Sequence, residues 1–461
     1  MNLMLFHRDL RIQNNAAVSA AAKTGRKTVF VFIFDNIQIE KNPYFSVPAF
    51  KFMLSSLDDL KAEISQKGGR LLMFRGDTQD ILRKLIKSIG VTSVFENRDF
   101  TPFSREREER IREVCRLNLC EYNCYDSISG VSPELTVKNN GTPYQVFSAF
   151  YRNWVRKYSN QIIQEINNFD GYIPPVENEM SDDDISMLKQ SLCGTGIDKQ
   201  EWGGRKNGLN ILKKTEDFEK GFYRFRDFPA LDSTTKLSSH LKFGTVGVHE
   251  AIATFSGIGT DGESLIRQLA WRDFFYSIMY FFPHVLGGAF HKRLDALKWL
   301  DNSNLFDAWC NGKTGYPIVD AGMRELNSTG FMHSRVRMIT ASFLVKDLHQ
   351  DWRLGEKYFA SKLVDYDPAL NNGNWQWCAS TGCDAQPWFR IFNPQTQQKK
   401  FDPDCEYIKK WVPELRDSTP YRIHNFEKLE IGNGYPSPVV SHKDSVSAFK
   451  SMYYSVKNGD A

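Results

Sequence analysis

The chain has 461 residues with 59 lysines and arginines against 55 aspartates and glutamates, a formal net charge of +4. A composition of 41% hydrophobic and 25% charged residues is typical of soluble globular proteins and excludes disordered and collagen-like chains. No apolar stretch approaches the roughly 18 residues of a membrane span, and the first residues lack the pattern of a secretory signal peptide. At about 150 residues per domain, the length predicts two to three domains.

The first 130 residues alternate short apolar runs with amphipathic stretches. The runs at 3–6, 28–34, 71–74 and 93–95 predict buried strands, and the stretches at 16–24 and 50–68 predict helices. Such alternation is typical of a parallel, doubly wound α/β sheet of the Rossmann-like kind. No GxGxxG or GxxxxGK[ST] motif follows a strand, so neither a standard dinucleotide site nor a P-loop is expected.

The rest of the chain divides into a connector and a helical domain. Residues 131–202 include Pro174, Pro175 and an acidic run, which indicate a solvated connector. From 203 to 461 we expect an all-helical domain. Helical spacing of buried positions is predicted on two helices, at Val336, Ile339, Phe343 and Leu344, and, behind Pro317, at Ile318, Gly322 and Leu326.

Cysteines and aromatic residues are distributed unevenly along the chain. The eight cysteines are scattered and form no CxxC pair, and no HExxH motif occurs, so we expect free thiols in a reducing compartment and no metal site. Nine of the ten tryptophans lie after residue 200. A buried indole needs a partner for its N–H, so the second half of the chain is the place to look for function.

Residues 365–377 are the most informative segment. They hold two acids, adjacent amides, a glycine and two tryptophans, and asparagine and glycine are poor helix formers. Acids and amides suit a polar ligand and indoles suit stacking on a flat one, but a polar loop with Trp375 and Trp377 in the core fits equally well. Arg335 and Arg337 lie on a mostly apolar helix and need a carboxylate, for which Asp365 is a candidate.

A second candidate site is the hydroxyl-rich turn at residues 234–238. It precedes a predicted helix over 239–243, and hydroxyls with free N–H groups at a helix start can bind phosphate. An ordinary N-cap without a ligand explains the same residues.

Taken together, eight ordered blocks resemble the photolyase/cryptochrome family, most closely the class I photolyases that repair cyclobutane pyrimidine dimers. The blocks are FHRDLR at 6–11, RDFP at 226–229, WRDFF at 271–275, GYPIVDA at 315–321, NSTG at 327–330, RMI at 337–339, NNGNWQW at 371–377 and FRIFNP at 389–394. The resemblance covers nearly the whole chain and implies an α/β antenna domain over 1–130, a connector over 131–202 and an all-α domain over 203–461 that binds FAD and DNA.

The resemblance also implies which residues bind FAD. These are Phe222, Tyr223, Thr234, Thr235, Lys236, Leu237, Ser238, Arg272, Ser334, Arg337, Asp365, Tyr366, Asp367 and Asn371. Within this set, residues 234–238 would hold the pyrophosphate, and Arg337 and Asp365 would pair beside the isoalloxazine. Asn371 falls where photolyases place asparagine opposite flavin N5, whereas plant cryptochromes have aspartate and animal ones cysteine. A neutral amide favours a fully reduced, anionic flavin as electron donor.

For repair, the resemblance implies a dimer flipped out of the duplex between Trp271 and Trp377. The DNA-binding residues would be Arg226, Gln268, Trp271, Ser334, Arg335, Met338 and Trp377, and the catalytic ones Gln268, Asn371 and Met338. Trp375, Trp352 and Trp299 would carry electrons from the surface to the flavin, although core packing explains all three on spacing alone. The (6-4) class would show a histidine pair around 333–337, and Arg337 occupies the second position.

Two positions depart from the family pattern. Gln268 stands where dimer-repairing members usually have glutamate, which keeps an N–H donor but loses an ionisable proton, and Ser334 replaces a common asparagine. The antenna chromophore, whether of flavin, deazaflavin or folate type, is not determined. Residues 42–44 and 98–103 are similar to archaeal members, which favours a flavin or deazaflavin.

The function implied is light-driven repair of pyrimidine dimers in DNA, catalysed by a deoxyribodipyrimidine photo-lyase. The implied protein is a monomer that binds damaged DNA and no membrane, in the cytoplasm at the nucleoid or in a eukaryotic nucleus. The alternative is a blue-light receptor of the cryptochrome type, which Asn371 and the short tail after residue 430 disfavour. A flavoprotein with other redox chemistry is a third possibility, against which Trp271, Met338 and Trp377 count.

Overall fold

The computed structural model describes residues 1–40, 42–158, 169, 175–194, 203–215, 222–231, 233–428 and 434–458. The chain forms two compact units. The N-terminal unit comprises Met1–Lys220 and Thr235–Phe281, and the C-terminal unit comprises Gly221–Thr234 and Phe282–Ala461. The division of the chain at residues 130 and 202 stays a prediction. Among the described residues, no helix is long and apolar enough to cross a bilayer.

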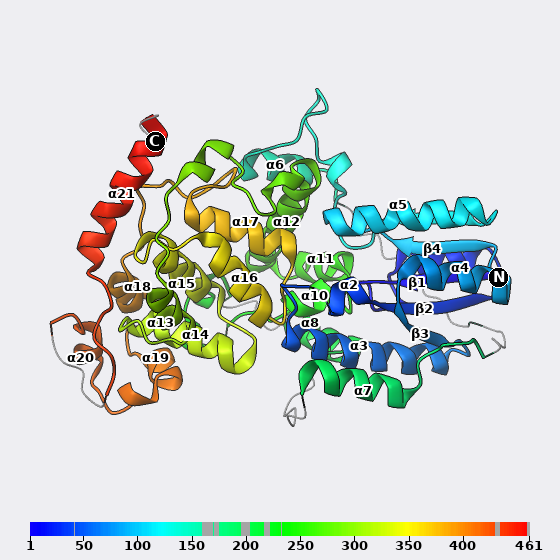
Figure 1. Ribbon diagram of the computed structural model, residues 1–461, viewed down its shortest axis with the longest axis horizontal. Helices are drawn as coiled ribbons and strands as arrows, with labels where there is room; N and C mark the ends of the chain where they lie inside the picture. The colour runs from blue at the N-terminus through cyan, green and yellow to red at the C-terminus, as the bar shows by residue number, and fades with distance from the viewer. Residues whose placement is uncertain are drawn as a thin grey trace. The chain divides into compact units, whose positions relative to one another are not determined.

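A five-stranded parallel sheet organises the N-terminal unit, with the strand order β3-β2-β1-β4-β5 (Figure 1). The strands are β1 Asn2–Phe6, β2 Thr28–Asp35, β3 Leu71–Gly76, β4 Ser93–Asn97 and β5 Glu121–Tyr125. The first four confirm the predicted strands within two residues. The fifth was missed because it is an edge strand: Glu121 is exposed and the other four residues are only half-buried, so no apolar run marks it.

Both faces of this sheet are covered by helices, as its near-continuous apolar strands require. On one face Leu3, Leu5 and Val31 share a core with helices α4 Thr78–Ile89 and α5 Pro102–Leu117. On the other face Phe34 contacts Phe50 of helix α3 Val47–Gln66. Helix α1 is Ala16–Lys23 and α2 is Asn36–Ile39. The predicted doubly wound α/β fold is therefore confirmed.

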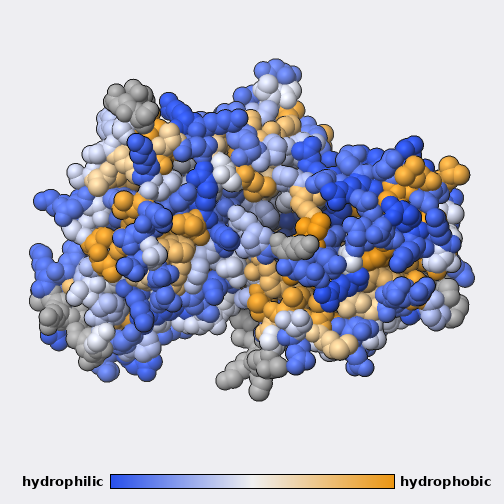
Figure 2. Space-filling model, in the orientation of Figure 1, coloured by the Kyte–Doolittle hydropathy of each residue, from blue (hydrophilic) through white to orange (hydrophobic). Residues whose placement is uncertain are grey.

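The outer surface of α5 is dominated by charge. Its sequence places arginine and glutamate one turn apart, and Arg110–Glu106, Arg112–Glu108 and Arg116–Glu113 form ion pairs there. Figure 2 shows polar side chains over this helix. Exposed pairs of this kind contribute little to stability, so α5 is held mainly by its buried face at Ile111 and Val114.

Helices complete the N-terminal unit. They are α6 Phe147–Trp154, α7 Asp182–Cys193, α8 Arg205–Lys214, α10 Ser238–Phe243, α11 Val248–Ser256 and α12 Gly259–Phe281. Helix α10 begins one residue before the predicted start at 239. On α12, the carboxylate of Asp273 accepts hydrogen bonds from the N–H groups of Gly130 and Val131 and from Trp154 Nε1. These bonds tie the segment after β5 to α12.

The described residues of the C-terminal unit form helices joined by loops, without strands (Figure 1). Its helices are α9 Phe222–Phe225, α13 Ser303–Cys310, α14 Pro317–Thr329, α15 Ser334–Lys346, α16 Trp352–Lys362, α17 Pro368–Ala379, α18 Pro394–Phe401, α19 Glu406–Trp411, α20 Pro420–His424 and α21 His442–Asn458. The predicted all-α character is confirmed. The predicted apolar positions on α14 and α15 are all in the core.

Two glycines allow helices of the C-terminal unit to approach closely. A Cβ on Gly322 of α14 would lie 2.4 Å from Val336 Cγ1 of α15, and one on Gly355 of α16 would lie 2.2 Å from Trp375 Cη2 of α17. Both distances are shorter than any real contact between carbon atoms. The indole of Trp375 therefore lies directly on the backbone of α16, the helix that begins at Trp352.

Candidate functional site

The predicted ion pair between Arg337 and Asp365 is present in the C-terminal unit. Arg337 Nη1 lies 3.2 Å from Asp365 Oδ1 and Nη2 lies 3.0 Å from Oδ2, which is a bidentate geometry. Arg337 Nε also donates to the carbonyl of Met332 at 2.7 Å. The Asp365 side chain is 5% exposed and that of Arg337 is 25% exposed, so the charge of the pair is shielded from water on the carboxylate side.

The segment after this pair is a helix, with Trp375 in the core and Trp377 packed against it. Pro368 occupies the first turn of α17, and the Asp367 carboxylate caps the helix by accepting from the N–H groups of Ala369 and Leu370. The polar loop considered from the sequence is therefore wrong. The asparagines at 371 and 372 are tolerated in the helix because their side-chain amides bond to other segments.

Asn371 is held in one orientation. Its Nδ2 donates to the backbone carbonyl of Glu356 on α16 at 3.0 Å, and the residue is 9% exposed. This bond uses one of the two N–H donors of Nδ2 and fixes the amide plane, and the acceptor Oδ1 is available to a ligand. An acceptor at this place matches a ligand that presents an N–H.

Next to it, Glu356 is a buried acid that the sequence did not single out. Asn372 Nδ2 donates to Glu356 Oε1 at 3.3 Å and to the carbonyl of Val285 at 2.9 Å. Burial raises the pKa of the Glu356 carboxyl to about 7, although the bond from Asn372 opposes the shift. A lone acid within an ordinary helical pattern carries no signal of this environment.

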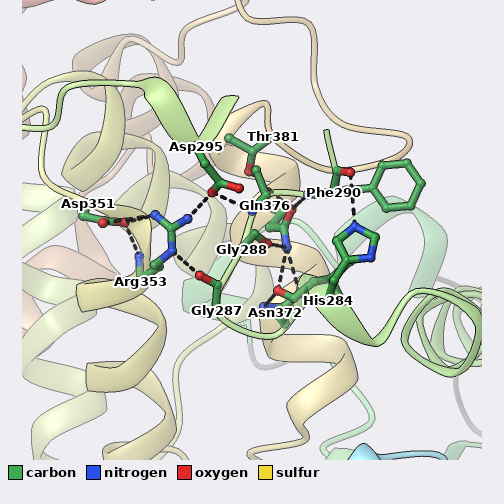
Figure 3. A network of polar contacts seen from close by, with 12 residues as sticks. His284, Gly287, Gly288, Phe290, Asp295, Asp351, Arg353, Asn372, Gln376 and Thr381 are labelled. Atoms are coloured by element: carbon green, nitrogen blue, oxygen red, sulfur yellow. Dashed lines mark hydrogen bonds and ion pairs between the residues drawn. The ribbon is translucent and has the colours of Figure 1, made fainter. Parts of the chain in front are cut away.

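Amides on α17 also fix the segment that follows α12 (Figure 3). Gln376 Nε2 donates to the carbonyls of Val285 and Gly288, and its Oε1 accepts from the N–H of Phe290 at 2.8 Å. Arg353 of α16 donates to the carbonyl of Gly287 at 2.7 Å and pairs with Asp351 and Asp295. The backbone of residues 285–290 is thus bonded on two sides by side chains of α16 and α17.

Of the three tryptophans predicted as an electron chain, two are buried and the third is partly exposed. Trp375 is 2% exposed and Trp352 is 1% exposed, and both belong to the main core of the C-terminal unit. Trp299 is half-buried and packs against that core. The guanidinium of Arg353 lies 4.9 Å from the centre of the Trp352 ring. Their role in electron transfer stays a prediction.

The turn at 234–238 has the irregular backbone of a ligand loop. Lys236 has φ of 53°, the left-handed region, and Thr235 Oγ1 accepts from the N–H of Leu237 at 3.3 Å. Leu237 is buried, Ser238 is exposed and Thr234 is half-buried. The N-cap position of α10 is taken by Leu237 and no side chain makes a capping bond there, so the N-cap interpretation is wrong and the phosphate site stays a prediction.

Other residues of the predicted FAD set are placed as follows. The Arg272 guanidinium, on α12, donates to the carbonyls of Ile128 and Leu241, so it anchors α10 just after the turn. In the C-terminal unit Phe222 is buried, Tyr366 is half-buried and Ser334 is exposed at the start of α15. The side chain of Tyr223 lies outside the described residues.

In the N-terminal unit Trp271 is prepared for stacking. Its ring lies parallel to that of Phe147, with centroids 3.6 Å apart and an interplanar angle of 9°. Phe147 is buried and Trp271 is half-buried, so one indole face is backed and the residue retains exposed surface. Gln268, one turn earlier on α12, is exposed. Phe147 was not found from the sequence, because it is distant in the chain and lies in no motif.

The remaining predicted DNA-binding residues lie in the C-terminal unit. Arg335 Nη2 pairs with Asp227 Oδ2 at 2.9 Å, and its guanidinium lies 4.5 Å from the centre of the Phe401 ring. This brings Arg335 to the segment that contains Arg226, which is half-buried. Met338 and Trp377 are half-buried as well. The predicted need of Arg335 for a carboxylate is met by Asp227 rather than by Asp365, which pairs with Arg337.

The start of α15 carries a histidine ring that is neutral at neutral pH. His333 caps this helix and is buried, and burial lowers its pKa to about 4, so the ring is neutral. Among the described residues, no group of three or more His, Cys, Asp or Glu side chains is arranged to hold a metal ion. All eight cysteines have free thiols.

Comparison with known proteins places these features in a family. The chain matches the family model for DNA photolyase over residues 2–168 and that for the FAD binding domain of DNA photolyase over residues 265–455. It is 35% identical to the deoxyribodipyrimidine photo-lyase of Halobacterium salinarum, over 98% of this chain and 99% of that protein. It is 33% identical to the deoxyribodipyrimidine photo-lyase of Escherichia coli, over 99% of each chain.

Solved structures give the same result. An archaeal photolyase from Sulfolobus tokodaii with two FAD molecules is 40% identical, with a TM-score of 0.85 over 98% of this chain and 100% of that one. A bacterial class III photolyase from Agrobacterium tumefaciens is 32% identical, with a TM-score of 0.88 over 99% of this chain and 98% of that one. A Synechocystis cryptochrome is 26% identical, with a TM-score of 0.84 over 98% of this chain and 99% of that one.

Proposed function

Since the chain belongs to the DNA photolyase family, we propose that it repairs cyclobutane pyrimidine dimers in DNA under light, as a deoxyribodipyrimidine photo-lyase. The geometry of Asn371 carries the preference for repair over a cryptochrome-type photoreceptor. Its Nδ2 is bonded to the Glu356 carbonyl, so it presents a neutral acceptor that delivers no proton. A cryptochrome with aspartate or cysteine at this place would present a group that can deliver a proton.

The match to the FAD binding domain of DNA photolyase identifies the cofactor as FAD. The described residues suit it: Arg337 and Asp365 offer both charges to a ring with donors and acceptors, and Asn371 offers Oδ1 to an N–H. The hydroxyls and left-handed turn at 234–238 suit a pyrophosphate. When bound, reduced and photoexcited, FAD would supply the electron that opens the cyclobutane ring and would take it back afterwards.

The chain's own residues then bind and orient the lesion. Trp271 and Trp377 offer indole faces for the flipped dimer, and stacking of this kind contributes about 1–3 kcal/mol per base. Phe147 prevents Trp271 from tilting, because the two rings are in parallel contact. Met338 packs against the dimer, Gln268 and Ser334 offer hydrogen bonds, and Arg226 and Arg335 hold flanking phosphates.

Three further properties belong to this proposal. A second chromophore of the flavin type serves as antenna, supported by the 40% identity to the Sulfolobus protein that contains two FAD molecules. The protein acts as a monomer on damaged DNA. It acts in the cytoplasm at the nucleoid, or in the nucleus if the source is a eukaryote.

The test is illumination of the photoreduced protein with a UV-irradiated thymine oligonucleotide. Recovery of thymine ultraviolet absorbance in the light, and none in the dark, is expected. Trp377→Ala should weaken binding of the irradiated oligonucleotide by about 1–3 kcal/mol, and Trp411→Phe, a tryptophan of the same unit outside the site, serves as the matched control. Absence of recovery with a flavin that is fully reduced would overturn repair and favour a photoreceptor.

A further inference from the structure

A fourth tryptophan contacts the innermost member of the predicted electron chain. Trp309, on α13, is 0% exposed, and its ring centroid lies 6.1 Å from that of Trp375, edge to face. Its Nε1 donates to the carbonyl of Thr340 at 3.0 Å. Trp309 belongs to none of the sequence blocks that indicated function, and its role in packing alone does not require an oxidisable ring.

Beyond Trp309 lies a tyrosine that reaches water. The Tyr358 ring centroid is 5.6 Å from that of Trp309, and the side chain is half-buried on α16. Its hydroxyl lies 2.7 Å from Asn327 Oδ1 and 3.0 Å from the carbonyl of Cys310. Burial raises the pKa of Tyr358 to about 12, so the phenol is protonated at rest.

The other aromatic neighbours of Trp309 cannot act as donors. Phe306 stacks on it at 5.9 Å and Phe359 at 5.7 Å. A phenylalanine ring is far harder to oxidise than an indole or a phenol. Trp309 and Tyr358 are therefore the oxidisable rings in ring contact along this line from Trp375 toward the surface.

We propose that Trp309 and Tyr358 form a second electron-donor route that branches from Trp375, parallel to the route through Trp352 and Trp299. This inference rests on the proposed function and on the predicted electron chain, in which light drives an electron from Trp375 to oxidised FAD. Trp309 then reduces the Trp375 radical cation, Tyr358 reduces Trp309, and the phenol proton of Tyr358 passes to water. The balance is one electron to the flavin, one proton to solvent and one neutral tyrosyl radical.

The contacts explain the direction of flow. The Trp309 N–H is bonded to a carbonyl, which is not a base, so an oxidised Trp309 keeps its proton and remains a strong oxidant. Tyr358 is half-buried and can lose its proton to water. Proton loss makes the final step hard to reverse, so the flavin keeps its electron until an external reductant restores Tyr358.

The experiment uses the full-length protein with oxidised FAD and no added donor at the flash. In the wild type, electron paramagnetic resonance after the flash should detect a tyrosyl radical that narrows when the protein is made with ring-deuterated tyrosine and disappears in Tyr358→Phe. In a Trp352→Phe background, part of the photoreduction should remain, and adding Trp309→Phe should remove it. The matched control is Phe306→Leu, because Phe306 also contacts the Trp309 ring but is not an electron donor.

Two outcomes overturn the branch: no tyrosyl signal in the wild type, or equal photoreduction in Trp352→Phe with and without Trp309. The wild-type measurement decides the matter even if Trp309→Phe fails to fold. Repair by chemically reduced protein separates this inference from the proposed function, because it needs no internal donor. Repair without a tyrosyl signal rejects only the branch, whereas loss of light-dependent repair in the chemically reduced wild type rejects the proposed function.

Discussion

The two compact units differ in how many tryptophans they contain, although both bury phenylalanine rings. The sheet of the N-terminal unit is packed with phenylalanine, such as Phe6, Phe30 and Phe34, all buried. Seven of the ten tryptophans lie in the C-terminal unit and three in the N-terminal one. Phenylalanine and tryptophan contribute similarly to a hydrophobic core, but only tryptophan brings an N–H and an oxidisable ring.

The difference shows that burial has two purposes in this protein. In the N-terminal unit the aromatic core stabilises a sheet. In the C-terminal unit Trp375, Trp309 and Trp352 are as deeply buried as the phenylalanines, and the ring of Trp309 connects that of Trp375 to the half-buried Tyr358. The comparison predicts that aromatic substitutions affect photochemistry in one unit and stability in the other.

The largest functional effect is expected from Trp375→Phe. Both proposed donor routes pass through this ring, so photoreduction of oxidised FAD should be almost completely lost. The measurement is the rate of flavin bleaching under blue light with an external reductant. Trp411→Phe, another tryptophan of the C-terminal unit, should bleach at the wild-type rate. Substantial bleaching of folded Trp375→Phe would show that electrons reach the flavin by a path that avoids it.

A substitution in the sheet of the N-terminal unit should affect stability and leave photochemistry unchanged. Phe30→Ala removes a ring that is 0% exposed and contacts Phe6 and Phe169, and should lower the free energy of unfolding by about 3–5 kcal/mol. Urea titration measures the loss, and Phe30→Leu should lose less than about 1.5 kcal/mol. Photoreduction per folded molecule should not change. A slower photoreduction would contradict the hypothesis that aromatic residues of the N-terminal unit serve stability alone.

A smaller effect concerns the buried acid of the C-terminal unit. The pKa of Glu356 is raised by burial from 4.5 to about 7, so its protonated form stabilises the folded state. This contribution is fully present below pH 4.5 and is lost as pH rises through about 7, an amount of about 3 kcal/mol. Glu356→Gln should remove this part of the pH dependence of unfolding. Identical pH profiles for the two proteins would contradict the raised pKa.

The smallest effect is expected at Gln268. Gln268→Glu restores an ionisable proton beside the proposed lesion site and should raise the quantum yield of dimer repair, by less than about tenfold, the equivalent of one hydrogen bond. The gain should fall as pH rises through the pKa of the new carboxyl, because only the protonated acid donates. The yield of the wild-type protein should show no such step. Equal quantum yields for the wild type and Gln268→Glu at all pH values would show that glutamine at this position does not limit repair.

Much of the fold could be predicted from the sequence. Four of the five strands and the helical character of the second half follow from hydrophobic periodicity, because burial on one face or both leaves a regular pattern. The failures also have a physical cause. The edge strand at Glu121–Tyr125 is only half-buried, and helix α17 reads as irregular because its amides bond to other segments rather than to water.

The sequence by itself determined the two fold classes, the family resemblance and the candidate residues, because these depend on residue type and order. Only the tertiary structure decided which atoms those residues present. It bonded Asn371 to Glu356 and so fixed the amide, stacked Phe147 on Trp271, and paired Arg335 with Asp227. It also brought Trp309 beside Trp375 across 66 residues of chain. A contact between two distant segments leaves no periodic pattern in the sequence of either segment. Such contacts can therefore be seen only in the folded structure.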